Sequence, residues 1–106
     1  MIYTIEELRQ RIIPIAQKYE IPAVYIFGSY ARGDAAENSD VDVLIQRKGS
    51  KIIGWTIGAL YEDLGECLNK RVDLVTLETL EQENTNERVP WFVDNLKKER
   101  LLIYAK

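Results

Sequence analysis

The chain has no histidine and a single cysteine, Cys67, among its 106 residues. Histidine is the commonest acid and base near neutral pH and the commonest metal ligand, so neither role can rest on it here. One cysteine forms no disulfide within the chain and supplies no cysteine-rich zinc site. Carboxylates, hydroxyls and backbone groups therefore remain as the candidates for any chemistry.

An excess of positive charge is also lacking. Lys and Arg together number 14 against 17 Asp and Glu, a formal net charge of -3, which argues against extended binding to nucleic acid. No apolar run approaches the ~18 residues that a membrane span needs, and the first residues lack the basic and apolar segments of a secretory signal. We therefore expect a cytoplasmic protein that binds neither a membrane nor a long nucleic acid.

The composition that is present fits one globular domain over residues 1–106. Hydrophobic residues make up 46% of the chain and charged residues 29%, and no internal repeat or linker interrupts it. The periodicity of apolar residues predicts helices and strands in alternation. Helices are expected at residues 4–19, 51–68 and 90–99, one helical turn at 28–33, and strands at 23–27, 40–46, 72–77 and 101–104.

Several residues predict how these elements begin and end. Thr4 with Glu7 three residues later is a capping-box pattern, and Ser29 can cap the short turn that follows the first strand. Gly33 is expected to stop that turn. Pro14 is expected to kink or break the first helix, because an interior proline removes one backbone hydrogen bond.

The helix predicted at residues 51–68 carries an apolar stripe that includes Ile53 and Cys67, so Cys67 is expected to be an inert core residue. Beside that stripe, three glycines form a line that lets another backbone approach closely. They are Gly54, Gly58 and Gly65. This line, Trp55 and Trp91 are candidates for contact with a partner protein.

Three aspartates lie at strand positions where their carboxylates can meet. Asp40 and Asp42 share one face of a predicted strand, about 6–7 Å apart, and a neighbouring strand about 4.8 Å away could bring Asp73 to them. Carboxylates this close repel one another unless a cation lies between them, and oxygen ligands alone favour Mg²⁺ or Mn²⁺ over zinc. An isolated Asp-x-Asp is more often a solvated strand face, and Asp73 could instead pair with Lys70 or Arg71.

A glycine-serine turn follows the first predicted strand. Gly28 has no side chain to block a phosphate, the backbone N–H groups after it can point at an anion, and the Ser29 hydroxyl adds a neutral donor. Two divalent ions about 3.5–4 Å apart support in-line displacement at phosphorus. The turn and the aspartates together therefore indicate chemistry on a phosphate ester.

These motifs resemble those of the minimal nucleotidyltransferases of the DNA polymerase β-like superfamily. The resemblance rests on Gly-Ser-Tyr-Ala-Arg-Gly at 28–33, Ser-Asp-Val-Asp-Val-Leu-Ile at 39–45 and Val-Asp-Leu-Val at 72–75. It implies an α/β (α+β) fold, in which a small mixed β-sheet has its helices packed mainly on one face. It also implies transfer of a nucleoside monophosphate from an NTP to an acceptor hydroxyl, with release of pyrophosphate.

Many members of this size resemble antitoxins encoded beside a HEPN-domain toxin, a ribonuclease. The resemblance therefore implies an antitoxin that transfers AMP from ATP to a tyrosine of that toxin. Two alternatives stay open: an antitoxin that neutralises its partner by binding alone, and nucleotidyl transfer to a small molecule. Larger relatives carry an added helical domain, so we expect a second copy of this chain or the partner protein to complete the site.

The resemblance also implies roles for the three aspartates. Asp40 and Asp42 would bind two ions, Mg²⁺ or Mn²⁺. Asp73 would bind the catalytic ion and help to remove the proton of the attacking hydroxyl.

The glycine-serine turn and the residues after it would bind the nucleotide. Gly28 and Ser29 would hold the triphosphate, and Arg32 would either steady a phosphate or fix the loop. No nucleophilic His, Cys or Lys accompanies the motif, so we expect one in-line step without a covalent enzyme intermediate.

Overall fold

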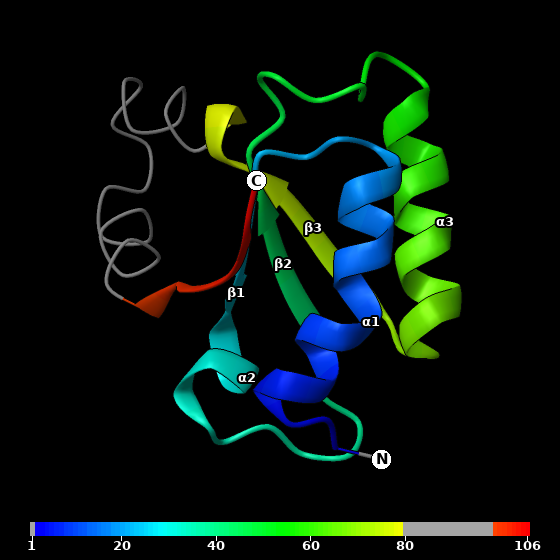
Figure 1. The fold of residues 1–106 in the computed structure, drawn as a ribbon. Coiled ribbons are helices and arrows are strands. Elements are labelled where there is room, and N and C mark those ends of the chain that lie inside the picture. The colour runs from blue at the N-terminus through cyan, green and yellow to red at the C-terminus, as the bar shows by residue number, and fades with distance from the viewer. Residues whose placement is uncertain (1, 80–98) are drawn as a thin grey trace.

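The computed structural model describes residues 2–79 and 99–106, and its helices and strands alternate as the sequence predicts (Figure 1). In chain order the elements are α1 (Ile5–Lys18), β1 (Ala23–Phe27), α2 (Gly28–Arg32), β2 (Val41–Ile45), α3 (Thr56–Leu68), β3 (Val72–Thr76) and β4 (Leu101–Ala105). The strand boundaries agree with the predicted ones to within one residue. The helix predicted at residues 90–99 and Trp91 fall on the part of the chain outside the described residues.

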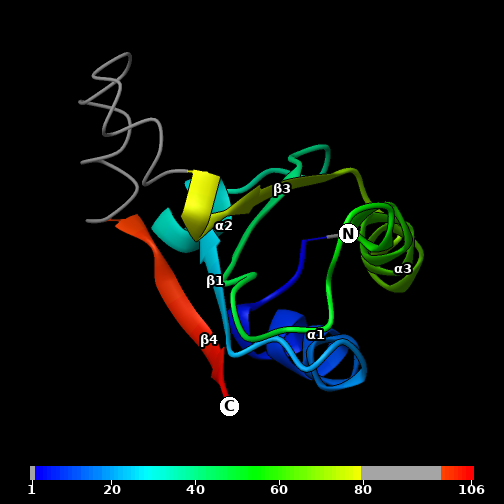
Figure 2. The same ribbon diagram turned by 90° about the horizontal axis from the view of Figure 1, so that it is seen from above.

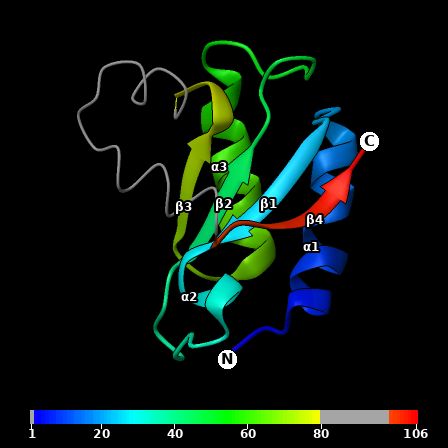
Figure 3. The same cartoon turned by 90° about the vertical axis from the view of Figure 1, so that its left-hand side faces the viewer.

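The described strands form one mixed sheet in the order β3-β2-β1-β4. β1 is antiparallel to both β2 and β4, whereas β2 and β3 are parallel. Parallel neighbours need a crossover connection, and α3 supplies it between β2 and β3. The first residues of β2 and β3 therefore lie side by side at one end of the sheet, near α2 (Figure 3).

Helices α1 and α3 cover one face of the sheet, which confirms the predicted arrangement (Figure 2). Their apolar residues form the main core with the side chains that the strands direct toward them. The fully buried members include Leu8, Ile12, Leu60, Leu64, Leu68, Val24, Ile26, Val41, Val43 and Ile45. The opposite face carries a smaller cluster, in which Phe27 and Leu44 are buried.

Helix α1 begins as predicted. The Thr4 hydroxyl accepts a hydrogen bond from the Glu7 N–H at 3.1 Å, and the Glu7 carboxylate accepts one from the Thr4 N–H at 2.9 Å. The helix runs through Pro14 without a break. It is held to the rest of the fold by packing, and by Arg9, whose Nε donates to the Ile103 carbonyl at 3.0 Å.

Helix α3 is shorter than predicted, because it begins at Thr56 rather than near Lys51. Gly54 has a φ of +46°, which a right-handed helix does not allow, so residues 51–55 form a loop. Ile53 is consequently 68% exposed and is not part of the apolar stripe. The predicted line of three glycines is wrong for the same reason, since only Gly58 and Gly65 lie on the helix.

Two further predictions are corrected in detail. Ser29 does not cap α2, because the helix already begins at Gly28 and its N-cap residue, Phe27, makes no side-chain capping bond. Gly33 ends α2 in the left-handed conformation, as predicted. Cys67 is only partly buried, and its thiol donates to the Arg11 carbonyl at 3.0 Å. Burial raises the pKa of this thiol, which fits the inert role expected for it.

The largest exposed apolar side chain of the described residues is Trp55, which is 85% exposed beside the start of α3. None of the helices in the described part of the chain has the length and apolar character needed to span a bilayer.

Two buried tyrosines give a matched test of the core. The Tyr3 hydroxyl donates to the Leu68 carbonyl at 2.6 Å, whereas the buried Tyr30 hydroxyl has no partner among the described residues. Tyr3→Phe should lower the free energy of unfolding by about 1–2 kcal/mol, and Tyr30→Phe should leave it unchanged or raise it, because only the first loses a bond. Urea denaturation measures both. A larger loss for Tyr30→Phe than for Tyr3→Phe would contradict this account of the core.

Candidate active site

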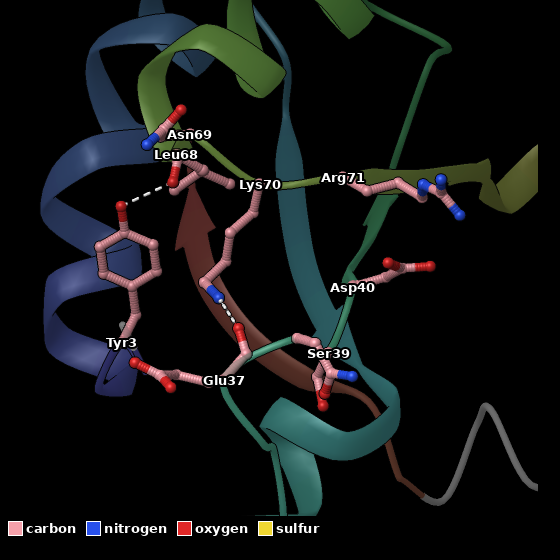
Figure 4. A pocket seen from close by; sticks show the side chains of 9 residues that line it. Tyr3, Glu37, Ser39, Asp40, Leu68, Asn69, Lys70 and Arg71 are labelled. Carbon is pink, nitrogen blue, oxygen red and sulfur yellow. Dashed lines mark hydrogen bonds between the residues drawn. The ribbon is translucent and has the colours of Figure 1, made fainter.

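The parallel pairing of β2 and β3 brings two of the three predicted aspartates together. Asp42 and Asp73 are direct partners in the register of these strands. Val41 and Val43 point into the core beneath the helices, so Asp42 between them projects from the opposite face. Asp40 lies two residues before Asp42, and Figure 4 shows its carboxylate pointing away from the helical side. The prediction that Asp73 is a neighbour of the Asp-x-Asp pair is confirmed.

Gly28 lies on the other side of Asp42 from Asp73. The strand register pairs Phe27 of β1 with Asp42, and Gly28 follows at once with a φ of +70°. A Cβ atom on Gly28 would lie 2.1 Å from Oδ2 of Asp42, well inside any allowed contact. Only glycine therefore lets the backbone turn pass this close to the carboxylate.

The electrostatics of the site centre on Asp42. Partial burial, followed by the charges of Asp73 and Asp40, raises the pKa of Asp42 to about 6, against the smaller opposing effect of Arg32. Among the described residues, no lysine or arginine lies within ion-pair distance of any of the three aspartates, so the alternative pairing of Asp73 with Lys70 or Arg71 is not observed. Apart from the smaller effect of Arg32, the mutual repulsion of the carboxylates is therefore not relieved by a basic side chain of the described residues.

The donor set fits a hard divalent cation, because every donor is a carboxylate oxygen. As they stand, the described residues contain no group of three or more His, Cys, Asp or Glu side chains already arranged to hold a metal ion. Asp40 and Asp73 are solvent-exposed, so little packing resists their rotation toward Asp42. A cation between them would oppose the partial burial and the repulsion that together raise the pKa of Asp42.

In this structure Arg32 forms ion pairs that hold the loop after α2. Its Nε lies 3.3 Å from Oδ2 of Asp34, and its Nη1 lies 3.2 Å from Oε2 of Glu99. These ion pairs connect the end of α2 to the loop after it and to the residues before β4. The side chain is 45% exposed, so each pair contributes little stability by itself.

Sequence reasoning missed the place of Arg71 beside Asp40. The Val41 N–H donates to the Arg71 carbonyl at 2.9 Å, which sets Arg71 next to the start of β2. Only part of the signal was available: Arg71 precedes Asp73 by two residues and directly precedes β3, but its place beside Asp40 depends on the register of β2 on β3. Glu99 was also missed as a partner of Arg32, and no local pattern in the sequence links residues so far apart.

The family model described as "Polymerase beta, Nucleotidyltransferase" matches residues 10–90, a span that includes β1, the glycine-serine turn and all three aspartates.

One curated relative and two solved structures extend this result. The chain is 38% identical over 76 residues to MJ0435 of Methanocaldococcus jannaschii, provisionally named a protein adenylyltransferase, and the alignment covers 72% of this chain and 81% of the relative. A toxin-antitoxin structure with AMP-PNP matches with a TM-score of 0.68 at 20% identity, covering 92% of this chain and 73% of that one. A complex of tri-AMPylated Shewanella oneidensis HEPN toxin with MNT antitoxin matches with a TM-score of 0.64 at 16% identity, covering 97% and 74%. At these identities the two structures support the fold.

Gly28 and Gly33 allow a controlled test of the close approach. Both have positive φ, but a Cβ on Gly33 would meet nothing within 4 Å. Gly33→Ala should therefore cost only the backbone penalty of about 1 kcal/mol, whereas Gly28→Ala should cost about 2–3 kcal/mol because it also displaces Asp42. Urea denaturation of the two variants measures the difference. Equal losses would show that the approach to Asp42 is not tight.

The raised pKa of Asp42 predicts how stability depends on pH. Because the folded value of about 6 exceeds the model-peptide value of 3.8, the folded state binds the proton more tightly, and the wild type loses stability as pH rises between these values. Asp42→Asn removes this loss. In EDTA the variant should be more stable than the wild type by about 1–2 kcal/mol near pH 7.5, less than the full linkage value because the carboxyl is only partly buried.

The same comparison near pH 4 is the control, since the folded carboxyl of the wild type is then protonated. The advantage of Asp42→Asn should shrink there. An advantage that is independent of pH, or a variant that is less stable than the wild type near pH 7.5, would refute the assigned electrostatics.

Proposed function

The chain belongs to the polymerase beta nucleotidyltransferase family, and from that premise we propose that it transfers AMP from ATP to a tyrosine hydroxyl of a partner protein. The partner is a HEPN toxin, and the chain acts as its antitoxin through one nucleotidyltransferase domain over residues 1–106. The observation that carries the proposal is the in-register pair of Asp42 and Asp73 beside Gly28, because it combines a place for cations with a place for phosphate.

The nature of the acceptor is supported by the relatives. MJ0435 is provisionally named for adenylyl transfer to protein, and it aligns over most of its length with this chain. The Shewanella complex joins a toxin that carries AMP to an antitoxin of this fold. A protein acceptor also fits the site, since the exposed carboxylates of Asp40 and Asp73 lie on an open surface that a large partner can reach.

The aspartates would hold the cations and move the proton. Asp40 and Asp42 would bind two divalent ions, Mg²⁺ or Mn²⁺, with Asp73 as a further ligand of one of them. When bound, these ions stabilise negative charge on the attacking and leaving oxygens. Asp73 would accept the proton of the attacking tyrosine hydroxyl. It lies on β3, which is farther than β2 from the glycine-serine turn at the end of β1, so it is on the side of Asp42 away from the triphosphate.

The glycine-serine turn would hold the leaving group. Gly28 and Ser29 bind the triphosphate of ATP, and Arg32 either steadies a phosphate or keeps the loop in place through Asp34 and Glu99. The tyrosine oxygen forms a bond to the α-phosphorus, the bond from that phosphorus to the β-phosphate bridging oxygen breaks, and pyrophosphate leaves. No covalent enzyme intermediate is formed. A second copy of this chain or the partner would cover the site during the step.

The decisive experiment mixes this protein, the product of the adjacent reading frame, Mg²⁺ and labelled ATP. Mass spectrometry should find AMP on a tyrosine of the neighbour. Asp42→Asn should reduce transfer by at least about a thousandfold, because it removes a metal-binding charge at nearly constant shape. Glu66→Gln, which neutralises an exposed carboxylate on α3, is the matched control and should leave transfer unchanged.

The outcomes separate the candidate functions. Equal transfer by wild type and Asp42→Asn would contradict the mechanism. A stable complex with no AMP transfer would indicate an antitoxin that works by binding alone, and transfer only to a small hydroxyl compound would indicate a different substrate.

A further inference from the structure

A cavity of about 510 Å³ opens at the end of the sheet where β2 and β3 begin, next to Asp40, one of the proposed metal ligands (Figure 4). Tyr3 and Leu68 close its helical side, and Asp40 and Arg71 lie on its other side. The Tyr3 hydroxyl is bonded to the Leu68 carbonyl, so this wall is fixed. The cavity is thus a preformed feature that adjoins Asp40, the first residue of the Asp-x-Asp pair.

Two basic side chains, Lys70 and Arg71, line the cavity. Lys70 crosses it and donates through Nζ to the Glu37 backbone carbonyl at 2.6 Å, which is a neutral acceptor (Figure 4). Within the described residues Lys70 forms no ion pair with a carboxylate. Arg71 is solvent-exposed and lies within ion-pair distance of no carboxylate among the described residues. Two acidic residues, Glu37 and Asp40, also line the cavity. If Asp40 binds a divalent cation in the working enzyme, Lys70 and Arg71 outnumber the other acidic residue of the lining and present positive charge to an entering group.

The order of the strands decides which reactant enters from this side. Across the sheet the site residues lie in the order Gly28 at the end of β1, Asp42 on β2 and Asp73 on β3. In-line displacement at phosphorus requires the attacking and leaving oxygens on opposite sides of the phosphorus. If the triphosphate lies against Gly28 on the β1 side, the attacking hydroxyl must come from the β3 side, which is where Lys70 and Arg71 lie.

We propose that this cavity is the acceptor subsite, and that Arg71 and Lys70 bind a carboxylate of the partner polypeptide close to the tyrosine that receives AMP. The inference rests on the proposed function and deepens it by naming what selects the acceptor. Arg71 directly precedes β3 and is two residues before Asp73, a separation of about 6–7 Å along extended chain, so the bound carboxylate belongs within a few residues of the modified tyrosine or beside it in space. The fork of the Arg71 guanidinium suits a carboxylate in two-point contact.

The test is steady-state kinetics of AMP transfer to the partner protein, with each substrate varied at saturating levels of the other. Arg71→Ala should raise the KM for the partner about tenfold and leave the KM for ATP unchanged, because it removes one charged contact to the acceptor. Lys70→Ala should act in the same direction, and Arg71→Lys should recover most of the loss. Lys51→Ala is the matched control, because Lys51 is exposed, pairs with Glu20 at 3.0 Å and does not line the cavity.

A second arm identifies the partner's group. Once mass spectrometry locates the modified tyrosine, each acidic residue near it in the partner is changed to the amide. One such change should reproduce the rise in KM, and its combination with Arg71→Ala should add no further rise, since both remove the same contact. Fully additive effects would overturn the inference.

The remaining outcomes are also decisive. A rise in the KM for ATP would assign the cavity to the nucleotide phosphates. No change in either KM would show that Lys70 and Arg71 do not bind the acceptor. Each of these results would overturn the acceptor-subsite inference but not the proposed function. If the wild type transfers no AMP, the proposed function fails, but calorimetry without nucleotide still tests the cavity. Arg71→Ala should then weaken partner binding about tenfold, and equal affinities would overturn the inference.

Discussion

The site depends on the repulsion between carboxylates that the β2–β3 register holds on adjacent strands. Asp42 and Asp73 are direct partners, Asp42 is partly buried, and Gly28 passes so close that no side chain could stand in its place. The fold supplies no lysine or arginine within ion-pair distance in the described residues to relieve this repulsion. Such an arrangement lowers the stability of the fold in the absence of cations, and we propose that hard cations bind there in the working enzyme.

The two faces of the sheet differ in how many apolar side chains they bury, and this difference explains how a small chain tolerates the loss of stability caused by the carboxylates. Nearly all of the buried apolar side chains lie between the sheet and helices α1 and α3, so that layer provides the stability. The opposite face carries only a small apolar cluster and is where Asp42 projects. Stability and chemistry are therefore assigned to different faces of the same strands, through the alternation of side chains along β2.

Much of the fold follows from local sequence patterns, and the rest depends on tertiary contacts. The apolar runs of the strands and the Thr4–Glu7 capping box act over a few residues, so their positions could be predicted. The start of α3 could not, because the positive φ of Gly54 is set by the loop and not by the periodicity around it. For the site, the Asp-x-Asp spacing placed Asp40 and Asp42 together, and strand neighbourhood suggested Asp73. The position of Arg71 beside Asp40 required the actual register of β2 on β3.

The most direct measurement of the central claim is anomalous diffraction from crystals of this protein grown with Mn²⁺ and a non-hydrolysable ATP analogue. We expect manganese peaks bounded by carboxylate oxygens of Asp40, Asp42 and Asp73, with the triphosphate against Gly28 and Ser29. Manganese at another place on the protein, or a bound nucleotide whose phosphates lie away from the three aspartates, would contradict it.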